Sequence, residues 1–218
     1  MQLTTSFPIP PAPSLLTHKS KVLSMGSCFA ASMGSRLSKL PLEVMTQPFG
    51  ILFHPFAISR ALSGVISEDV YEQSGYFLHP DYHSNFTATS PVELLDDIRS
   101  VASEVSSFIG VADFLILTWG TSFSYFDKYL NKSVANCHKM PADRFDKRLS
   151  MVDEIVSDFH SLLSTLPSTT QVVLTVSPVR HTKDGMMENQ VSKSTLRVAA
   201  DIVAKRFENV HYFPAYEI

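Results

Sequence analysis

Short apolar runs alternate along the chain with longer segments that are apolar on one side only. Residues 22–25, 113–118 and 171–176 are short and largely apolar, and 43–46 and 209–213 predict two further strands. Near-continuous apolar strands are typical of a parallel sheet that is covered on both faces. The pattern therefore predicts a parallel sheet at the centre of the protein.

The segments between these strands repeat apolar residues every three or four positions, as one face of a helix requires. Helices are expected directly after Gly26-Ser27-Cys28, from near Pro55, from Pro91 with Ser90 as its cap, over 145–166, and from Ser192. The positions expected to face the core are Phe29, Met33, Leu37 and Leu40; Ile58, Leu62 and Val65; Leu94, Ile98, Val101, Val105 and Phe108; Phe145, Leu149, Val152, Val156, Phe159 and Leu163; and Leu196, Ala200, Val203 and Phe207.

Two segments depart from this alternation. Residues 6–13 contain four prolines, so residues 1–20 are expected to form a proline-rich extended arm. Residues 68–89 are polar and aromatic without a clear period, and we interpret them as a long loop over the upper edge of the sheet.

The order of strands and helices predicts a three-layer α/β/α sandwich with a mostly parallel sheet. The chain has 218 residues, of which 44% are hydrophobic and 18% charged, so residues 1–218 are expected to form a single domain with one core.

The composition narrows the possible partners and the location. With a net charge of −3 and no basic cluster, nucleic acid is not expected as a partner. No apolar run approaches the roughly 20 residues that span a bilayer, and the first residues lack the basic start of a signal peptide. A cytoplasmic protein without a membrane partner is expected, and the sequence leaves its oligomeric state open.

The cysteine count bears on disulfides and metals. Cys28 and Cys137 are too few for a disulfide scaffold, so free thiols in a reducing compartment are expected. Together with His138 and His181 they lack the close spacing of zinc ligands. No metal and no other cofactor is expected.

Candidate chemical groups follow three of the expected strands. Gly26-Ser27-Cys28 follows the first, Trp119-Gly120-Thr121-Ser122 follows the middle one, and Ser177-Pro178-Val179-Arg180-His181 follows the next. Because ligands bind beyond the carboxyl ends of strands in open parallel sheets, these groups predict a site at one edge.

Five ordered motifs carry a family resemblance. "GSCFA" at 26–30 is followed by "NCHKMP" at 136–141, "SPVRH" at 177–181, "SK" at 192–193 and "YFPAYE" at 212–217. This set resembles the GSCFA-domain family, which is similar to the SGNH/GDSL hydrolases, a group of esterases, deacetylases and acyltransferases on a flavodoxin-like sheet. The resemblance implies an acyl-transfer enzyme that acts on a small or carbohydrate-like acyl substrate.

The resemblance also implies roles for the residues of the first turn. Cys28 falls at the nucleophile position, and the start of a helix favours its thiolate form. Ser27 could be the nucleophile instead, but a helix cap is the better interpretation.

Oxyanion donors are implied at other positions. Gly50 matches the glycine whose N–H helps to hold the oxyanion. Gly120-Thr121-Ser122 stands where the superfamily has Gly-x-Asn-Asp, so Thr121 or Asn136 would have to replace the missing asparagine donor.

The general base is the main open question. The superfamily takes its histidine from an Asp-x-x-His block after the last strand, and this sequence ends at Ile218. Either the sequence is C-terminally incomplete, which we favour, or the base is His83, His138 or His181.

The remaining candidates bear on binding. Arg180 beside His181 could bind a carboxylate or phosphate. His18, His79, His160 and His211, and for the most part Cys137, are interpreted as structural. The alternative function is a non-catalytic binding or scaffold domain that retains the fold.

Overall fold

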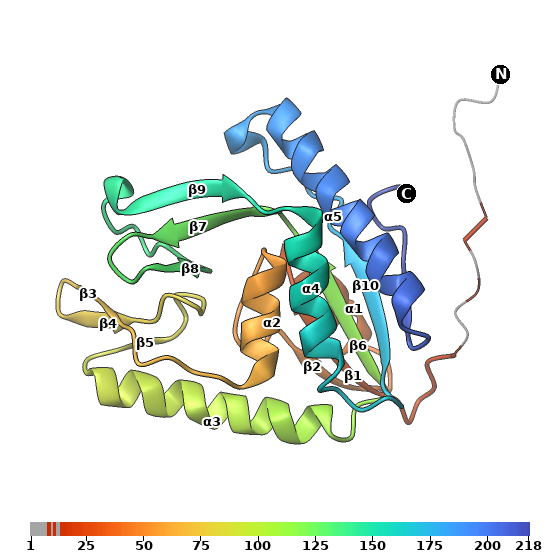
Figure 1. The fold of residues 1–218 in the computed structure, drawn as a ribbon. Coiled ribbons are helices and arrows are strands. Elements are labelled where there is room, and N and C mark those ends of the chain that lie inside the picture. The colour runs from red at the N-terminus through yellow and green to blue at the C-terminus, as the bar shows by residue number, and fades with distance from the viewer. Residues whose placement is uncertain (1–7, 10, 12–13) are drawn as a thin grey trace.

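A five-stranded parallel sheet forms the centre of the protein in a computed structural model that describes residues 8–9, 11 and 14–218 (Figure 1). The strands are β1 (Lys21–Gly26), β2 (Glu43–Thr46), β6 (Phe114–Trp119), β10 (Gln171–Val176) and β11 (Val210–Tyr212). Their order is β11-β10-β6-β1-β2, and every neighbouring pair is parallel. The other residues of the expected arm, 1–7, 10 and 12–13, lie outside the described residues.

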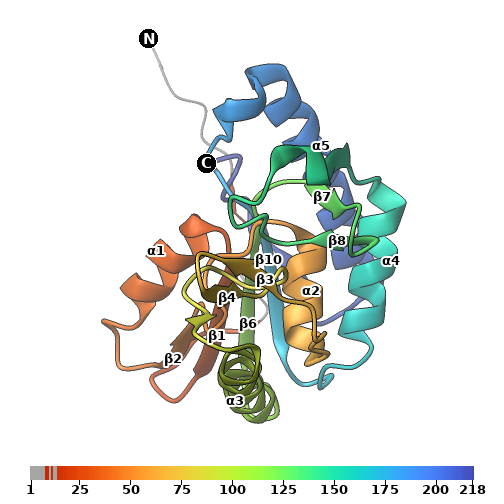
Figure 2. The same ribbon diagram turned by 90° about the vertical axis from the view of Figure 1, so that its left-hand side faces the viewer.

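Helices cover both faces of this sheet. Helix α1 (Cys28–Leu37) lies on one face, and α2 (Pro55–Ser63), α4 (Val152–Leu163) and α5 (Met186–Arg206) lie on the other (Figure 2). Helix α3 (Pro91–Ile109) packs beside α2 and begins at the expected cap, Ser90, whose Oγ accepts from Glu93 N–H at 3.2 Å. The expected α/β/α sandwich is confirmed.

The main core lies between the sheet and the helices of the second face. Leu117 of β6 is in register with Met25 of β1 and Leu174 of β10, so these three side chains share one face, and all are fully buried. Two residues further along β6, on the same face, the Trp119 ring packs edge to face against Phe159 of α4, with 4.7 Å between the ring centroids. This packing fixes the carboxyl end of β6, where candidate site residues follow.

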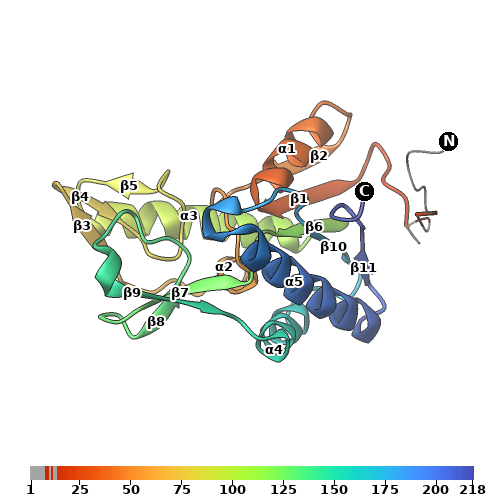
Figure 3. The same ribbon diagram turned by 90° about the horizontal axis from the view of Figure 1, so that it is seen from above.

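Two small antiparallel sheets extend from the same side of the central sheet (Figure 3). The first contains β3 (Tyr71–Gln73), β4 (Tyr76–Leu78) and β5 (Thr87–Ala88), and the second contains β7 (Phe123–Asp127), β8 (Lys132–Val134) and β9 (Phe145–Leu149). Two short 3-10 helices, η1 (Ala142–Arg144) and η2 (Thr182–Asp184), complete the elements.

These sheets correct two expectations. Residues 68–89 are not one continuous loop, because eight of them form β3, β4 and β5 of the first small sheet. The helix expected over 145–166 begins only at Val152, because residues 145–149 form β9, which pairs antiparallel with β7. That pairing with a distant strand overrides a local period that a helix would also fit.

Smaller corrections concern helix ends. Leu40 and Val65 were expected in the core but lie beyond their helices and are 54% and 74% exposed. Helix α2 ends where Gly64 takes a left-handed conformation, with φ 71°. Helix α5 begins at Met186, ahead of the expected Ser192. In α1 the buried residues are Ala30 and Gly34, in place of the larger residues expected to face inward.

His54, the cap of α2, contacts the residue before β7 and the residue after β9. Its Nδ1 accepts from Phe56 N–H at 3.1 Å, so Nε2 carries the proton; Nε2 lies 3.3 Å from Ser122 O and 3.0 Å from Ser150 Oγ. Burial is the main cause that lowers the His54 pKa from 6.5 to about 3. The folded protein therefore holds His54 neutral across the neutral and mildly acidic range.

This shift predicts acid sensitivity of folding. As the pH falls below 6.5 the unfolded chain gains a proton at His54, whereas the folded protein does not until about 3. The free energy of unfolding should therefore decrease by about 1.4 kcal/mol per pH unit across this window, and be unaffected by His54 above it. Urea denaturation at pH 7 and pH 5 measures the slope, and His54→Asn, which can still cap the helix, should flatten it. Equal slopes for both proteins would contradict this account.

Candidate functional site at the carboxyl edge of the sheet

The turn Gly26-Ser27-Cys28 joins β1 to α1 at the carboxyl edge of the sheet. Gly26 has φ 132°, and a Cβ placed on it would lie 2.1 Å from Thr118 O of the neighbouring strand. Ser27 N–H donates to the same Thr118 oxygen at 3.0 Å. The turn is therefore pressed against β6, and only glycine fits at its first position.

Ser27 is a helix cap, as the sequence favours. It is fully buried, and its Oγ accepts from Phe29 N–H at 3.3 Å. Cys28, half-buried, is the first residue of α1. Within the described part of the chain its N–H has no hydrogen-bond acceptor. An oxyanion is favoured at this helix terminus.

Gln47, directly after β2, holds this turn from the other side. Its Oε1 accepts from Gly26 N–H at 3.0 Å, and its Nε2 donates to Gly26 O at 3.0 Å and to Ser27 O at 2.9 Å. Gln47 itself has a positive φ of 49°. Sequence reasoning missed this residue, because a single glutamine after a strand carries no signal beyond its position.

The three contacts predict a cost for Gln47→Glu. A carboxylate accepts only, so it would face the Gly26 and Ser27 carbonyl oxygens without donating to either. We expect a loss of about 3 kcal/mol in the free energy of unfolding and slower alkylation of Cys28. Denaturant titration and thiol labelling measure both effects. Gln190→Glu makes the same change on the exposed face of α5, and an equal loss in that variant would contradict the prediction.

Ser192 and Lys193 of α5 hold the ends of β6 and β10. Ser192 Oγ accepts from Ser122 N–H at 2.8 Å and lies 3.1 Å from Thr121 Oγ1. Lys193 is fully buried, and its Nζ donates to Gly120 O at 2.6 Å and to Ser177 O at 2.8 Å. This pair is the "SK" motif, but no local pattern predicts that its lysine is buried at the site.

His181 lies beside an aromatic pocket on the same edge. The backbone N–H of His181 donates to Asn189 Oδ1 at 2.9 Å. Its ring packs edge to face against Phe53, with 5.2 Å between the ring centroids. Its buried Nε2 has no partner among the described residues. Burial, followed by the charge of Lys193, lowers the His181 pKa. The imidazole is therefore neutral near pH 7 and able to accept a proton.

The pocket has a volume of about 420 Å³ and is bounded by Phe53, Phe123 and Tyr125 together with His181 and Thr121. Aromatic walls with a few polar groups are typical of small-molecule sites. Arg180, the neighbour of His181, is exposed and forms no ion pair with any described residue.

The expected oxyanion donors are engaged elsewhere. Gly50 N–H donates to Gln47 O at 2.8 Å, and the N–H groups of Gly120 and Thr121 both donate to Phe53 O, at 2.7 and 3.2 Å. An oxyanion at these positions would have to displace a hydrogen bond. Of the N–H groups of Cys28, Gly50, Gly120 and Thr121, that of Cys28 is without an acceptor among the described residues.

The other expected residues lie around the small sheets. His83 packs on the loop that contains Gly50, where an added Cβ would lie 2.3 Å from the His83 Cβ. Asn136 Oδ1 accepts from His138 N–H at 2.9 Å, and both residues line a separate pocket of about 430 Å³. Among the described residues, neither Asn136 nor His138 forms a hydrogen bond with Cys28.

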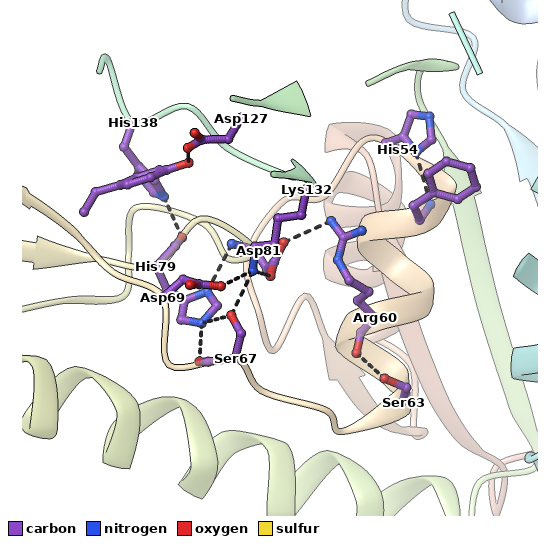
Figure 4. Close-up of polar contacts among 12 residues, drawn as sticks. His54, Arg60, Ser63, Ser67, Asp69, His79, Asp81, Asp127, Lys132 and His138 are labelled. Carbon is purple, nitrogen blue, oxygen red and sulfur yellow. Dashed lines mark hydrogen bonds and ion pairs between the residues drawn. The ribbon is translucent and has the colours of Figure 1, made fainter. Parts of the chain in front are cut away.

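His138 belongs to a polar network beneath the small sheets (Figure 4). Its Nε2 donates to His79 O at 2.8 Å, while Lys132 pairs with Asp69 at 2.6 Å and with Asp81 at 3.1 Å. Arg60 of α2 reaches Asp81 at 3.0 Å. These pairs tie the small sheets to α2.

Two further features of the described residues bear on the site. Nowhere among them do three His, Cys, Asp or Glu side chains gather as metal ligands do. None of the described helices is at once long enough and apolar enough to cross a membrane.

Comparison with known protein families gave a match over most of the chain. The model of the GSCFA family matches residues 21–218, a range that includes the turn at Cys28 and every residue at the carboxyl edge. Searches of curated proteins and of solved structures gave no match to the chain.

Proposed function

The chain belongs to the GSCFA family, and we propose that it transfers acyl groups, with Cys28 as the nucleophile. The observation that carries this proposal is the position of Cys28, which is the first residue of α1 at the carboxyl edge of the sheet and whose N–H has no acceptor among the described residues. A small or carbohydrate-like acyl ester is the proposed substrate, and the aromatic pocket beside His181 would bind it.

In the first half of the reaction, the Cys28 sulfur loses its proton to a neighbouring base and attacks the acyl carbon. A C–S bond forms, and the carbonyl π electrons move to oxygen, where the Cys28 N–H at the start of α1 stabilises the oxyanion. The oxyanion then collapses, and the bond from the acyl carbon to the leaving alcohol breaks. The leaving oxygen takes up the proton that Cys28 released, and a thioester remains.

The second half removes the acyl group from sulfur. Neutral His181 would take a proton from water or from an acceptor hydroxyl as that oxygen attacks the thioester. The C–S bond then breaks and the Cys28 thiolate is restored. The acceptor decides between hydrolysis and transfer, and both outcomes use the same residues.

A binding domain without catalysis is the alternative, and one observation favours it. The N–H groups of Gly50, Gly120 and Thr121 already have acceptors, so few N–H donors remain to stabilise an oxyanion. In that case the pocket beside His181 would bind a ligand without turnover.

The test is a comparison of acyl substrates with the wild-type protein. p-Nitrophenyl acetate and butyrate, and an acetyl thioester, should be turned over repeatedly and faster than by an equal concentration of free cysteine. Binding without turnover across this set would favour the alternative. The free thiols Cys28 and Cys137 support a reducing location, and we propose the cytoplasm.

A further inference from the structure

The cavity of about 430 Å³ lies between the first small sheet and the loop after β8. One of its walls is a single face of that sheet. Gln73 is opposite Tyr76 and Leu78 is opposite Thr87 in the strand pairing. Opposite residues of antiparallel strands point to the same face, and all four of these residues line the cavity. No described residue lines both this cavity and the pocket beside His181, so the two are separate sites.

The loop after β8 forms the opposite wall, and its hydrogen bonds hold it in place. Pro80 O accepts from the N–H groups of Ala135 and Asn136, at 3.0 and 2.9 Å. The buried His138 donates from Nε2 to His79 O at 2.8 Å (Figure 4). The fold therefore forms this wall without a ligand, which lowers the entropic cost of binding one.

Two consecutive residues of this loop have a left-handed backbone. His138 and Lys139 have φ values of 46° and 59°, which are unfavourable for residues with a Cβ. Such strain persists only where the surrounding structure holds it, and it is frequent at binding sites. Both strained residues line the cavity.

The polar groups around the cavity are free to bind a ligand. Among the described residues, the Gln73 amide, the Asn136 Nδ2 and the Tyr76 hydroxyl have no acceptor. Lys139 is exposed and forms no ion pair with the described residues. No Asp or Glu of the described residues lines the cavity. Neutral amides and hydroxyls beside one cation suit a ligand that has several hydroxyls and one negative charge.

We propose that this cavity binds a monosaccharide that carries one carboxylate or phosphate group. The side-chain amides of Gln73 and Asn136 donate to the sugar hydroxyls, and the Lys139 ammonium pairs with the anionic group. The Tyr76 ring, whose residue is 52% exposed, packs against the apolar C–H face of the sugar ring. The volume is in the range of small-molecule sites. This binding does not depend on acyl transfer at Cys28.

NMR titration of the isotope-labelled wild-type protein tests the binding and its location. The probes are glucuronate, glucose 6-phosphate and glucose, with acetate and inorganic phosphate as free anions, each up to about 50 mM because single sugars bind weakly. At least one acidic sugar should bind about fivefold more tightly than glucose or its free anion, as one added charge pair at an exposed site allows. The side-chain amide signals of Gln73 and Asn136 should shift, and that of Gln190 on α5 should not.

Two variants test the residues that carry the inference. Lys139→Met should weaken binding of the acidic sugar about fivefold and leave glucose binding unchanged. Lys39→Met is the matched control, because Lys39 is also an exposed lysine without an ion pair among the described residues but does not line the cavity. Tyr76→Ala should weaken all three sugars and leave the free anions unchanged, whereas Tyr76→Phe, which keeps the ring, should weaken them less.

Four results would overturn the inference: no shift of the Gln73 and Asn136 signals with any sugar, glucose bound as tightly as both acidic sugars, free anions bound as tightly as the acidic sugars, or equal losses in Lys139→Met and Lys39→Met. The wild-type titration needs no substitution, so it decides even where a variant does not fold. Sugar binding should persist in Cys28→Ala, and Lys139→Met should keep wild-type turnover of p-nitrophenyl acetate. Failure of the sugar site is therefore distinguishable from failure of the proposed acyl transfer.

Discussion

Replacing Cys28 by alanine is expected to abolish acyl transfer, with a fall in turnover of about 10⁴-fold or more. The methyl group of alanine cannot attack an acyl carbon, and Ser27, the neighbouring hydroxyl, is fully buried as the cap of α1. No other nucleophile occupies the first residue of the helix. Initial rates with p-nitrophenyl acetate measure the loss.

Cys137→Ala is the matched control, because it removes the other cysteine. Cys137 is also half-buried, but burial raises its pKa to about 11, so its thiolate is scarce at neutral pH. This variant should keep wild-type turnover. If Cys28→Ala keeps turnover while Cys137→Ala loses it, the nucleophile has been assigned to the wrong cysteine. A Cys28→Ala protein that still binds substrate would show that only the chemistry was removed.

The second large effect is expected from Gly26→Ala, which should cost more than about 4 kcal/mol in the free energy of unfolding. The added Cβ would lie 2.1 Å from Thr118 O, a backbone atom in the neighbouring strand, and the φ of 132° is itself unfavourable for alanine. The turn and β6 cannot both keep their places. Thermal and urea denaturation measure the cost.

Gly64→Ala separates steric contact from backbone strain. Gly64 also has a positive φ, of 71°, but an added Cβ there would find no atom within 4 Å. This variant should lose only about 1 to 2 kcal/mol, the cost of a left-handed conformation for a residue with a Cβ. Similar losses in the two variants would mean that β1 and β6 can separate, and that the turn is not held as tightly as described.

Much of the fold could be predicted because three of the five central strands, β1, β6 and β10, are short apolar runs with local signals at their ends. Ser90 and Pro91 mark the start of α3, and glycine followed by serine marks the end of β1 and the cap of α1. The prediction of a helix over residues 145–149 was wrong because these residues form a strand, β9, whose partner β7 lies about twenty residues earlier in the sequence. No local period records such a pairing. The first small sheet was not predicted because its strands are only two or three residues long, too short for an alternating pattern to be recognised.

The candidate site was predictable in part. Cys28, Ser27 and His181 could be placed because they directly follow apolar strands. Gln47 and Lys193 could not, because each acts through contacts with residues far away in the sequence. A lysine inside a helix is ordinarily an exposed residue, and only the packing of α5 over the strand ends makes Lys193 a buried one.

The measurement that tests the central claim most directly is the mass of the protein during turnover of p-nitrophenyl acetate. Samples quenched at short times, digested and sequenced by mass spectrometry reveal where the acetyl group attaches. The account predicts an acetyl thioester on Cys28 that forms within the first turnover, is released by hydroxylamine and disappears when the substrate is exhausted. Turnover with the acetyl group on Ser27 or on another residue, or with Cys28 unmodified throughout, would contradict it.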